Sequence, residues 1–194
     1  MFGIQLNTKV IKTAVRVIRD LITTQSTART RLLSDLTNVC TKCDDAYGAL
    51  ITRLRPIHAA RTPARVAVEI QSFTSDATTR KKFKPERLCS EIDKLLVDLA
   101  SNVKSLKYAV NVGSITTIQQ TLRSMGNYDQ ALYHQYDEFR MELQSIGQAI
   151  QAADASQQPA LVAHAKSTIA DTERDLREAI RSIRKAKDEI VKFT

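Results

Sequence analysis

Glycine, proline and aromatic residues are scarce in this sequence, which has 5 Gly, 4 Pro, no Trp and 5% aromatic residues among its 194 positions. Low glycine and proline content combined with long periodic stretches favours helices, and no window alternates apolar and polar residues between turn signals as a half-buried strand does. Uninterrupted apolar runs are only a few residues long, far short of the roughly 20 that cross a bilayer as a helix. The sequence therefore predicts an all-α protein without a transmembrane helix.

Cysteine is scarce too. The chain has 3 cysteines and no apolar secretory segment at its start, which predicts a reducing compartment, the cytoplasm, and no disulfide framework. Cys40 and Cys43 have C-x-x-C spacing, but a zinc site needs four ligands and a thioredoxin-type motif needs a βαβ unit. Both fall on the apolar seam of a helix predicted over 28–55. We therefore interpret them, and Cys89, as core residues, because cysteine packs like a small apolar side chain.

Motifs that carry catalysis or cofactor binding are missing. The sequence has no P-loop, no Rossmann glycine motif, no G-x-S-x-G and no H-E-x-x-H. A di-iron bundle needs Glu three residues before His, and none of the 3 histidines has one. Asp129 falls on a core seam; a catalytic role stays open, but fixing helix register is the favoured interpretation. We predict no cofactor, no metal and no enzymatic activity.

The stretch from Pro159 to Phe193 has the most regular pattern in the chain. Its apolar positions follow a heptad spacing, with branched residues at Val162, Ile169, Leu176, Ile183 and Ile190, and mostly small residues at Ala165, Thr172, Ala179 and Ala186 before Phe193. This pattern predicts a helix over 159–193 with one continuous packing seam, which other helices must cover. The flanking charges predict the i,i+4 pairs Glu173–Arg177, Arg174–Glu178, Arg184–Asp188 and Lys185–Glu189.

Three further long helices are predicted, over 28–55, 85–111 and 115–151, with Pro56 ending the first. An amphipathic helix and turn occupy 1–27, a short helix runs from Pro63 to about residue 73 with Thr62 as its N-cap, and a basic loop spans 75–84. Long helices joined by short turns predict a single domain over 1–194, an antiparallel four-helix bundle with two shorter accessory helices.

Positive charge is concentrated in the N-terminal part of the chain. Residues 1–87 hold 16 Lys and Arg against 7 Asp and Glu, whereas residues 88–194 hold 13 against 14. Two groups of bases are candidate lipid- or partner-contacting residues, a stripe on the first helix and a cluster in the predicted loop: Lys9, Lys12, Arg16 and Arg19, and then Arg80, Lys81, Lys82 and Lys84. The stripe also has a simpler interpretation, as the solvent-facing side of a bundle helix. The cluster likewise has one, as a solvated loop tip.

Two functions suit this layout. The favoured one is a non-enzymatic protein-interaction or signalling module that binds a protein partner, or a second copy of itself, through helix packing. A basic amphipathic start followed by a bundle with a long last helix also resembles, in layout alone, the helical bundles of HeLo and MLKL-type cell-death executors. That alternative predicts an anionic-lipid-binding or pore-forming bundle at the periphery of a membrane, through residues 1–24. Nucleic-acid binding is less favoured, because the sequence has no recognisable DNA- or RNA-binding module.

Overall fold

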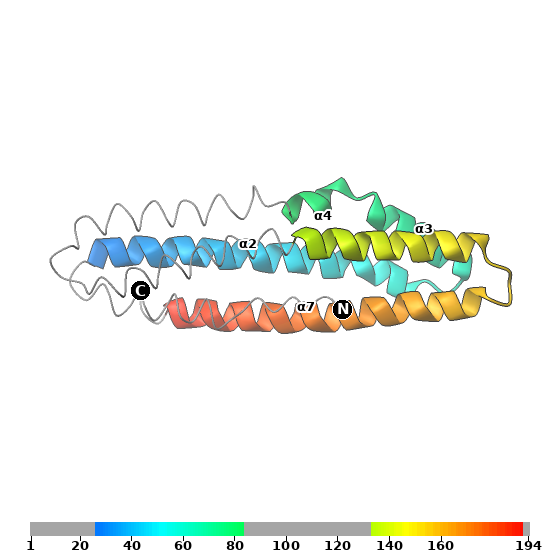
Figure 1. Ribbon diagram of the computed structural model, residues 1–194. Helices are drawn as coiled ribbons and strands as arrows, with labels where there is room; N and C mark the ends of the chain where they lie inside the picture. The colour runs from blue at the N-terminus through cyan, green and yellow to red at the C-terminus, as the bar shows by residue number, and fades with distance from the viewer. Residues whose placement is uncertain (1–25, 84–132, 192–194) are drawn as a thin grey trace.

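The computed structural model describes residues 26–83 and 133–191 as helices and short connections (Figure 1). The labelled helices are α2 (Ser26–Ala59), α3 (Pro63–Thr74), α4 (Ala77–Lys82) and α7 (Gln158–Val191), and a further helix covers residues 133–152. No strand occurs in these two ranges, which confirms the all-α prediction for them. The predictions for 1–25, 84–132 and 192–194, including the helix over 85–111, Cys89 and Asp129, lie outside the described residues.

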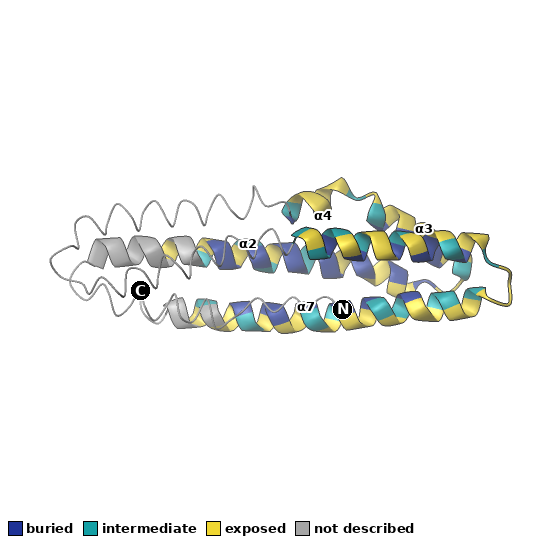
Figure 2. Cartoon of the chain, viewed as in Figure 1, coloured by how far each residue is buried: buried dark blue, intermediate teal, exposed yellow. Residues whose placement is uncertain are grey.

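Helices α2 and α7 lie side by side and run in opposite directions along the long axis of the molecule (Figure 1). Helix 133–152 runs parallel to α2 and antiparallel to α7, to which it is joined by a short turn. Helices α3 and α4 pack on α2, and Phe73 of α3 places its ring against Tyr136 and Phe139 of helix 133–152. The described helices therefore pack around one shared apolar core (Figure 2).

The heptad seam predicted for the last helix faces this core. Ile169, Leu176 and Ile183 are fully buried, and the small seam residues Ala165 and Thr172 are buried with them. Such small side chains let neighbouring helices approach α7 closely, as the sequence predicted. The helix over 159–193 is thus confirmed over Gln158–Val191.

The two cysteines of the C-x-x-C spacing are buried in the same core. Cys40 is 1% exposed and Cys43 is 7% exposed. Burial raises the pKa of the Cys40 thiol to about 12, although nearby Lys187 acts in the opposite direction. A thiol with so high a pKa is protonated at neutral pH and is therefore a poor nucleophile. The interpretation of these residues as apolar packing is therefore confirmed.

Helix α2 continues beyond the proline that was predicted to end it. Pro56 lies inside α2, which ends at Ala59 instead of residue 55. A proline within a helix removes one backbone hydrogen bond and crowds the preceding turn. Here that cost is offset because Ile57 is fully buried, and because the N–H of Ala60 donates to the Pro56 carbonyl at 3.1 Å. Tertiary burial has overridden the local helix-breaking signal.

The segment 75–84, predicted as a loop, contains the short helix α4. Asp76 caps it, because its carboxylate accepts from the backbone N–H of Thr78 at 3.1 Å and from the Thr79 hydroxyl at 2.6 Å. The preceding helix α3 has the predicted cap, since the Thr62 hydroxyl accepts from the Arg65 N–H at 3.3 Å. Asp76 also pairs with Arg53 of α2 at 2.9 Å, which fixes the start of α4 against the bundle.

Replacing Asp76 by alanine should lower the free energy of unfolding by about 1 kcal/mol at pH 7, the usual effect of losing an N-cap. Partial burial opposes ionisation, but the bonds from Thr79 and Thr78 and the charge of Arg53 outweigh it, so the pKa of Asp76 is lowered from 3.8. A lowered pKa stabilises the fold above the unfolded-state value, and this contribution is lost as pH falls through the folded-state value. Urea denaturation at pH 7 and pH 3 should therefore show the Asp76→Ala effect shrinking in acid.

Thr62→Ala provides the matched control for this pH dependence. It removes an N-cap oxygen that does not titrate, so its destabilisation should be similar at pH 7 and pH 3. An Asp76→Ala effect that stays constant over the same range would contradict the electrostatic contribution assigned to Asp76.

Candidate interaction groove

The eight basic residues singled out in the sequence are only partly within the described structure. Five of them lie outside it, namely Lys9, Lys12, Arg16, Arg19 and Lys84. The remaining three, Arg80, Lys81 and Lys82, are all in α4.

Two of the three bases in α4 take part in contacts that hold this helix on the bundle. The Lys82 ammonium lies 2.9 Å from both carboxylate oxygens of Asp45 in α2. Arg80 donates to the Tyr133 hydroxyl at 3.2 Å and lies 3.6 Å from the Asp137 carboxylate. These contacts join α4 to two different helices. Arg80 and Lys82 thus have a structural role that the sequence analysis did not assign to them.

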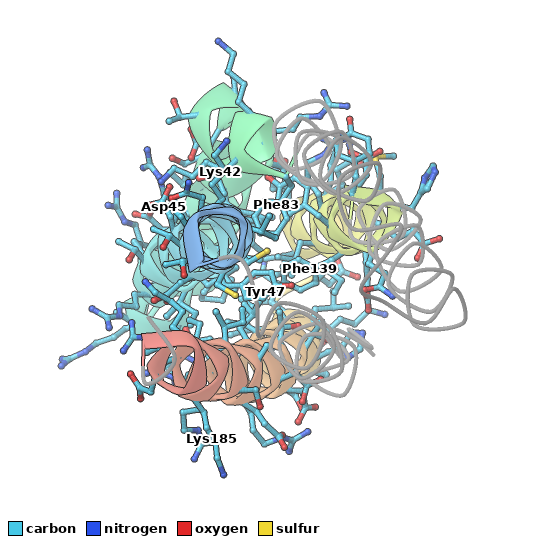
Figure 3. The ribbon with its side chains drawn as sticks, turned by 90° about the vertical axis from the view of Figure 1, so that its left-hand side faces the viewer. Lys42, Asp45, Tyr47, Phe83, Phe139 and Lys185 are labelled. Atoms are coloured by element: carbon cyan, nitrogen blue, oxygen red, sulfur yellow. The ribbon has the colours of Figure 1, made fainter. Side chains whose placement is uncertain are left out.

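A groove of about 540 Å³ lies between helix 133–152 and α7. The wall from helix 133–152 is formed by Gln135, Glu138, Phe139 and Glu142, and the wall from α7 by Thr168, Asp171, Thr172, Arg174 and Asp175. Phe139, which Figure 3 shows between these two helices, and Thr172 are both 4% exposed. The groove therefore has a buried floor and charged walls.

Negative charge dominates the walls of this groove. Four carboxylates face a single cation, Arg174, which lies 3.2 Å from Asp171 and 3.6 Å from Asp175. On the opposite wall no cation of the described residues pairs with Glu138 or Glu142. These two residues are one helical turn apart, and like charges at that spacing destabilise a helix by a few tenths of a kcal/mol. The wall of helix 133–152 therefore carries two like charges at a spacing that is unfavourable for the helix itself.

The lining of the groove combines four carboxylates and one guanidinium with uncharged polar side chains, and the Thr172 hydroxyl already donates to the Thr168 carbonyl at 2.9 Å. Within residues 26–83 and 133–191, no group of three or more His, Cys, Asp or Glu could hold a metal ion. The volume of the groove and its excess of negative charge suit a helix that carries basic residues along one edge.

Sequence analysis missed this groove. The signal was present as two like-charged pairs, Glu138 with Glu142 and Asp171 with Asp175, each flanking a core residue of its helix. Such repetition of one sign along one edge of a helix is unfavourable locally. The pattern alone does not reveal which two helices are neighbours, so it could not place the four carboxylates around a common groove.

Comparisons with protein-family models, with curated protein sequences and with solved structures find no match for this chain. No helix in the described ranges has the length and apolar character needed to cross a bilayer. The assignment of function therefore depends on the groove itself.

Proposed function

We propose that the protein is a non-enzymatic interaction module that binds a basic amphipathic helix in the groove between helix 133–152 and α7. The observation that carries this proposal is the pair Glu138 and Glu142, whose carboxylates line an open groove without a cation of the described residues beside them. A helix bound there would bring its basic side chains beside these carboxylates.

The wider architecture that we propose for this module is the antiparallel four-helix bundle in the cytoplasm. Helices α2 and α7 and helix 133–152 would supply three long helices, and residues 85–111 would supply the fourth. The described arrangement supports this, because these three long helices already pack around one apolar core, with the short helices α3 and α4 beside α2. The anionic-membrane alternative has less support, since Arg80 and Lys82 already form internal contacts.

The binding proposal predicts that removing the carboxylates of Glu138 and Glu142 weakens binding of a basic helix about ten-fold, since two exposed pairs at up to about 1 kcal/mol each give that order of change. The probe is a fluorescent amphipathic peptide with Lys and Arg at i,i+3 and i,i+4 spacing, titrated with the full chain at low salt. Fluorescence anisotropy should show weaker binding by Glu138→Gln/Glu142→Gln. The thermal midpoint of that variant should not fall, because a like-charge repulsion has been removed.

A matched variant separates the groove from general charge effects. Glu178→Gln/Asp188→Asn also removes two negative charges, from exposed positions of α7 that do not line the groove. Its affinity for the peptide should stay within about two-fold of the wild-type value once the general effect of net charge is screened. Equal weakening by both variants, or no binding by the wild-type chain, would argue against the groove as a helix-binding site.

A further inference from the structure

The turn between α2 and α3 contains a sequence pattern that the groove does not use. Of the 4 prolines in the chain, only Pro63 follows a serine or threonine, and Arg65 stands two residues after it. A hydroxyl residue followed by proline, with a base two residues beyond, is the acceptor pattern of proline-directed protein kinases. No Asp or Glu occurs between Asp45 and Glu69, so no carboxylate close in sequence opposes a kinase that prefers a basic substrate.

The acceptor of this pattern, Thr62, is exposed, and its backbone is already extended. It lies between α2 and α3 with φ −110° and ψ 147°, as the N-cap of α3. Enzymes that modify a protein act preferentially at exposed connections, where the chain can leave its fold at low cost. The pattern is therefore placed where a modifying enzyme can reach it.

Only the first turn of α3 has to open for the whole pattern to become extended. Ala64 and Arg65 are exposed, whereas Val66 is fully buried, so opening this turn leaves the buried face of α3 in place. At Thr62 itself, the opening breaks a bond from the Arg65 N–H to the hydroxyl at 3.3 Å and one from the Val66 N–H to the carbonyl at 2.9 Å. Fraying of a terminal turn is among the least costly openings of a folded protein.

The chain just before Thr62 is anchored to another helix. Lys166 of α7 donates to the carbonyl of Ala60 at 2.7 Å, which ties the residue after α2 to α7. This bond belongs to the register contacts between α2 and α7, which also include Arg184 with Asp44 and Lys187 with the Thr41 hydroxyl, each at 3.0 Å. The acceptor is thus held at a defined place on the bundle while the turn after it opens.

We propose that Thr62 is a phosphorylation site for a proline-directed serine/threonine kinase. The kinase transfers the terminal phosphoryl group of MgATP to Thr62. The bond from that phosphorus to the bridging oxygen of ADP breaks, a bond to the threonine hydroxyl oxygen forms, and the hydroxyl proton passes to the catalytic aspartate of the kinase. The proposal is independent of the groove, whose lining contains no residue of α2 or α3.

A phosphate on Thr62 should strengthen the start of α3. The side chain already occupies the N-cap position, where backbone N–H groups of the first turn lack helical partners and the helix dipole favours an anion. Arg61, which is adjacent in sequence and exposed, pairs with no carboxylate of the described residues and can bind the phosphate. The modification therefore closes the turn that the kinase had to open.

Treatment of the full chain with a proline-directed kinase and MgATP tests the proposal. Mass spectrometry should show one added phosphoryl group, and fragmentation should place it on Thr62. The variant Pro63→Ala keeps the acceptor hydroxyl, and its initial rate should be about ten-fold lower, because proline at that position carries the specificity of the kinase. Thr78 is an internal control, since it is exposed in α4 but followed by threonine, and it should stay unmodified.

Thermal unfolding of the modified chain tests the role of the phosphate. Its midpoint should be about 2–4 °C above that of the untreated chain, the shift expected in a chain of this size for an anion at a helix N-terminus. Thr62→Ala has no acceptor, so kinase treatment should leave its midpoint unchanged. A lower midpoint after phosphorylation of Thr62 would overturn the capping role assigned to the phosphate.

A synthetic peptide of residues 56–70 shows whether the kinase recognises the sequence outside the fold. Phosphorylation of this peptide but not of the folded chain would overturn the proposal, since the first turn of α3 would then stay closed to the kinase. No phosphorylation of either, or equal rates for the wild-type chain and Pro63→Ala, would overturn it as well. None of these results bears on binding of the basic helix in the groove, which is measured separately.

Discussion

Replacing Phe83 by alanine should lower the free energy of unfolding by about 3–5 kcal/mol, the range for truncating a fully buried phenylalanine. Phe83 is 0% exposed and forms the C-cap of α4. Its ring stacks on Tyr136 with centroids 4.5 Å apart and planes inclined by 4°, and on Tyr47 with centroids 6.2 Å apart (Figure 3). One side chain therefore joins α4, α2 and helix 133–152. Chemical denaturation followed by circular dichroism measures the loss.

Two further substitutions separate packing from charge in this part of the molecule. Phe83→Leu keeps much of the apolar volume and should cost only about 1–2 kcal/mol. Lys81→Ala, at an exposed neighbouring position of α4, should change the free energy of unfolding by less than about 0.5 kcal/mol. A Phe83→Ala effect as small as that of Lys81→Ala would mean that α4 is not held in place by its aromatic contact.

The second large effect is expected at Gly147, where alanine should destabilise the fold by up to about 2 kcal/mol. A Cβ atom at this position would lie 2.8 Å from Cγ2 of Ile70 in α3, closer than packed carbon atoms come. Ile70 is 1% exposed and β-branched, so its side chain has little freedom to move away. Overpacking of about 1–3 kcal/mol therefore outweighs the roughly 1 kcal/mol by which alanine favours a helix over glycine.

Gly48→Ala is the matched control and should have the opposite sign. Gly48 lies inside α2, and no atom of a neighbouring element is within 4 Å of where its Cβ would stand. The helix preference of alanine then acts alone and should raise the free energy of unfolding by about 0.5–1 kcal/mol. Denaturation curves of the two variants, measured together, should move in opposite directions. A stabilising Gly147→Ala would show that α3 does not pack as closely on helix 133–152 as described.

The parts of this fold that the sequence predicts well are those determined by local periodicity. The seam of α7 follows directly from Ile169, Leu176 and Ile183, because a heptad repeat fixes the face that a helix buries. The cap at Thr62 is equally local, since the hydroxyl and the N–H that it accepts are within one turn. Both predictions needed only neighbouring residues.

The parts that the sequence did not predict depend on contacts between distant residues. The run from residue 80 to 84 reads as a solvated charged loop, and Phe83 is buried there because its ring packs on the rings of Tyr136 and Tyr47, which lie on other helices. Arg184 was predicted to pair with Asp188 but instead donates to Asp44, which is 140 residues away. Of the predicted pairs, Glu173 with Arg177 forms at 3.2 Å. The candidate groove was missed for the same reason, since its walls come from two helices.

The register contacts between α2 and α7 also bear on the order in which the molecule folds. They join residues that are 106, 140 and 146 positions apart. Helix 133–152 and α7 are separated by only a short turn, and closing a loop of more than a hundred residues costs roughly 2.5 kcal/mol more in chain entropy than closing so short a turn. The pairing of α2 with α7 should therefore form late, whereas the helical hairpin that carries the groove can form early and locally. The groove would then exist before the core of the molecule is complete.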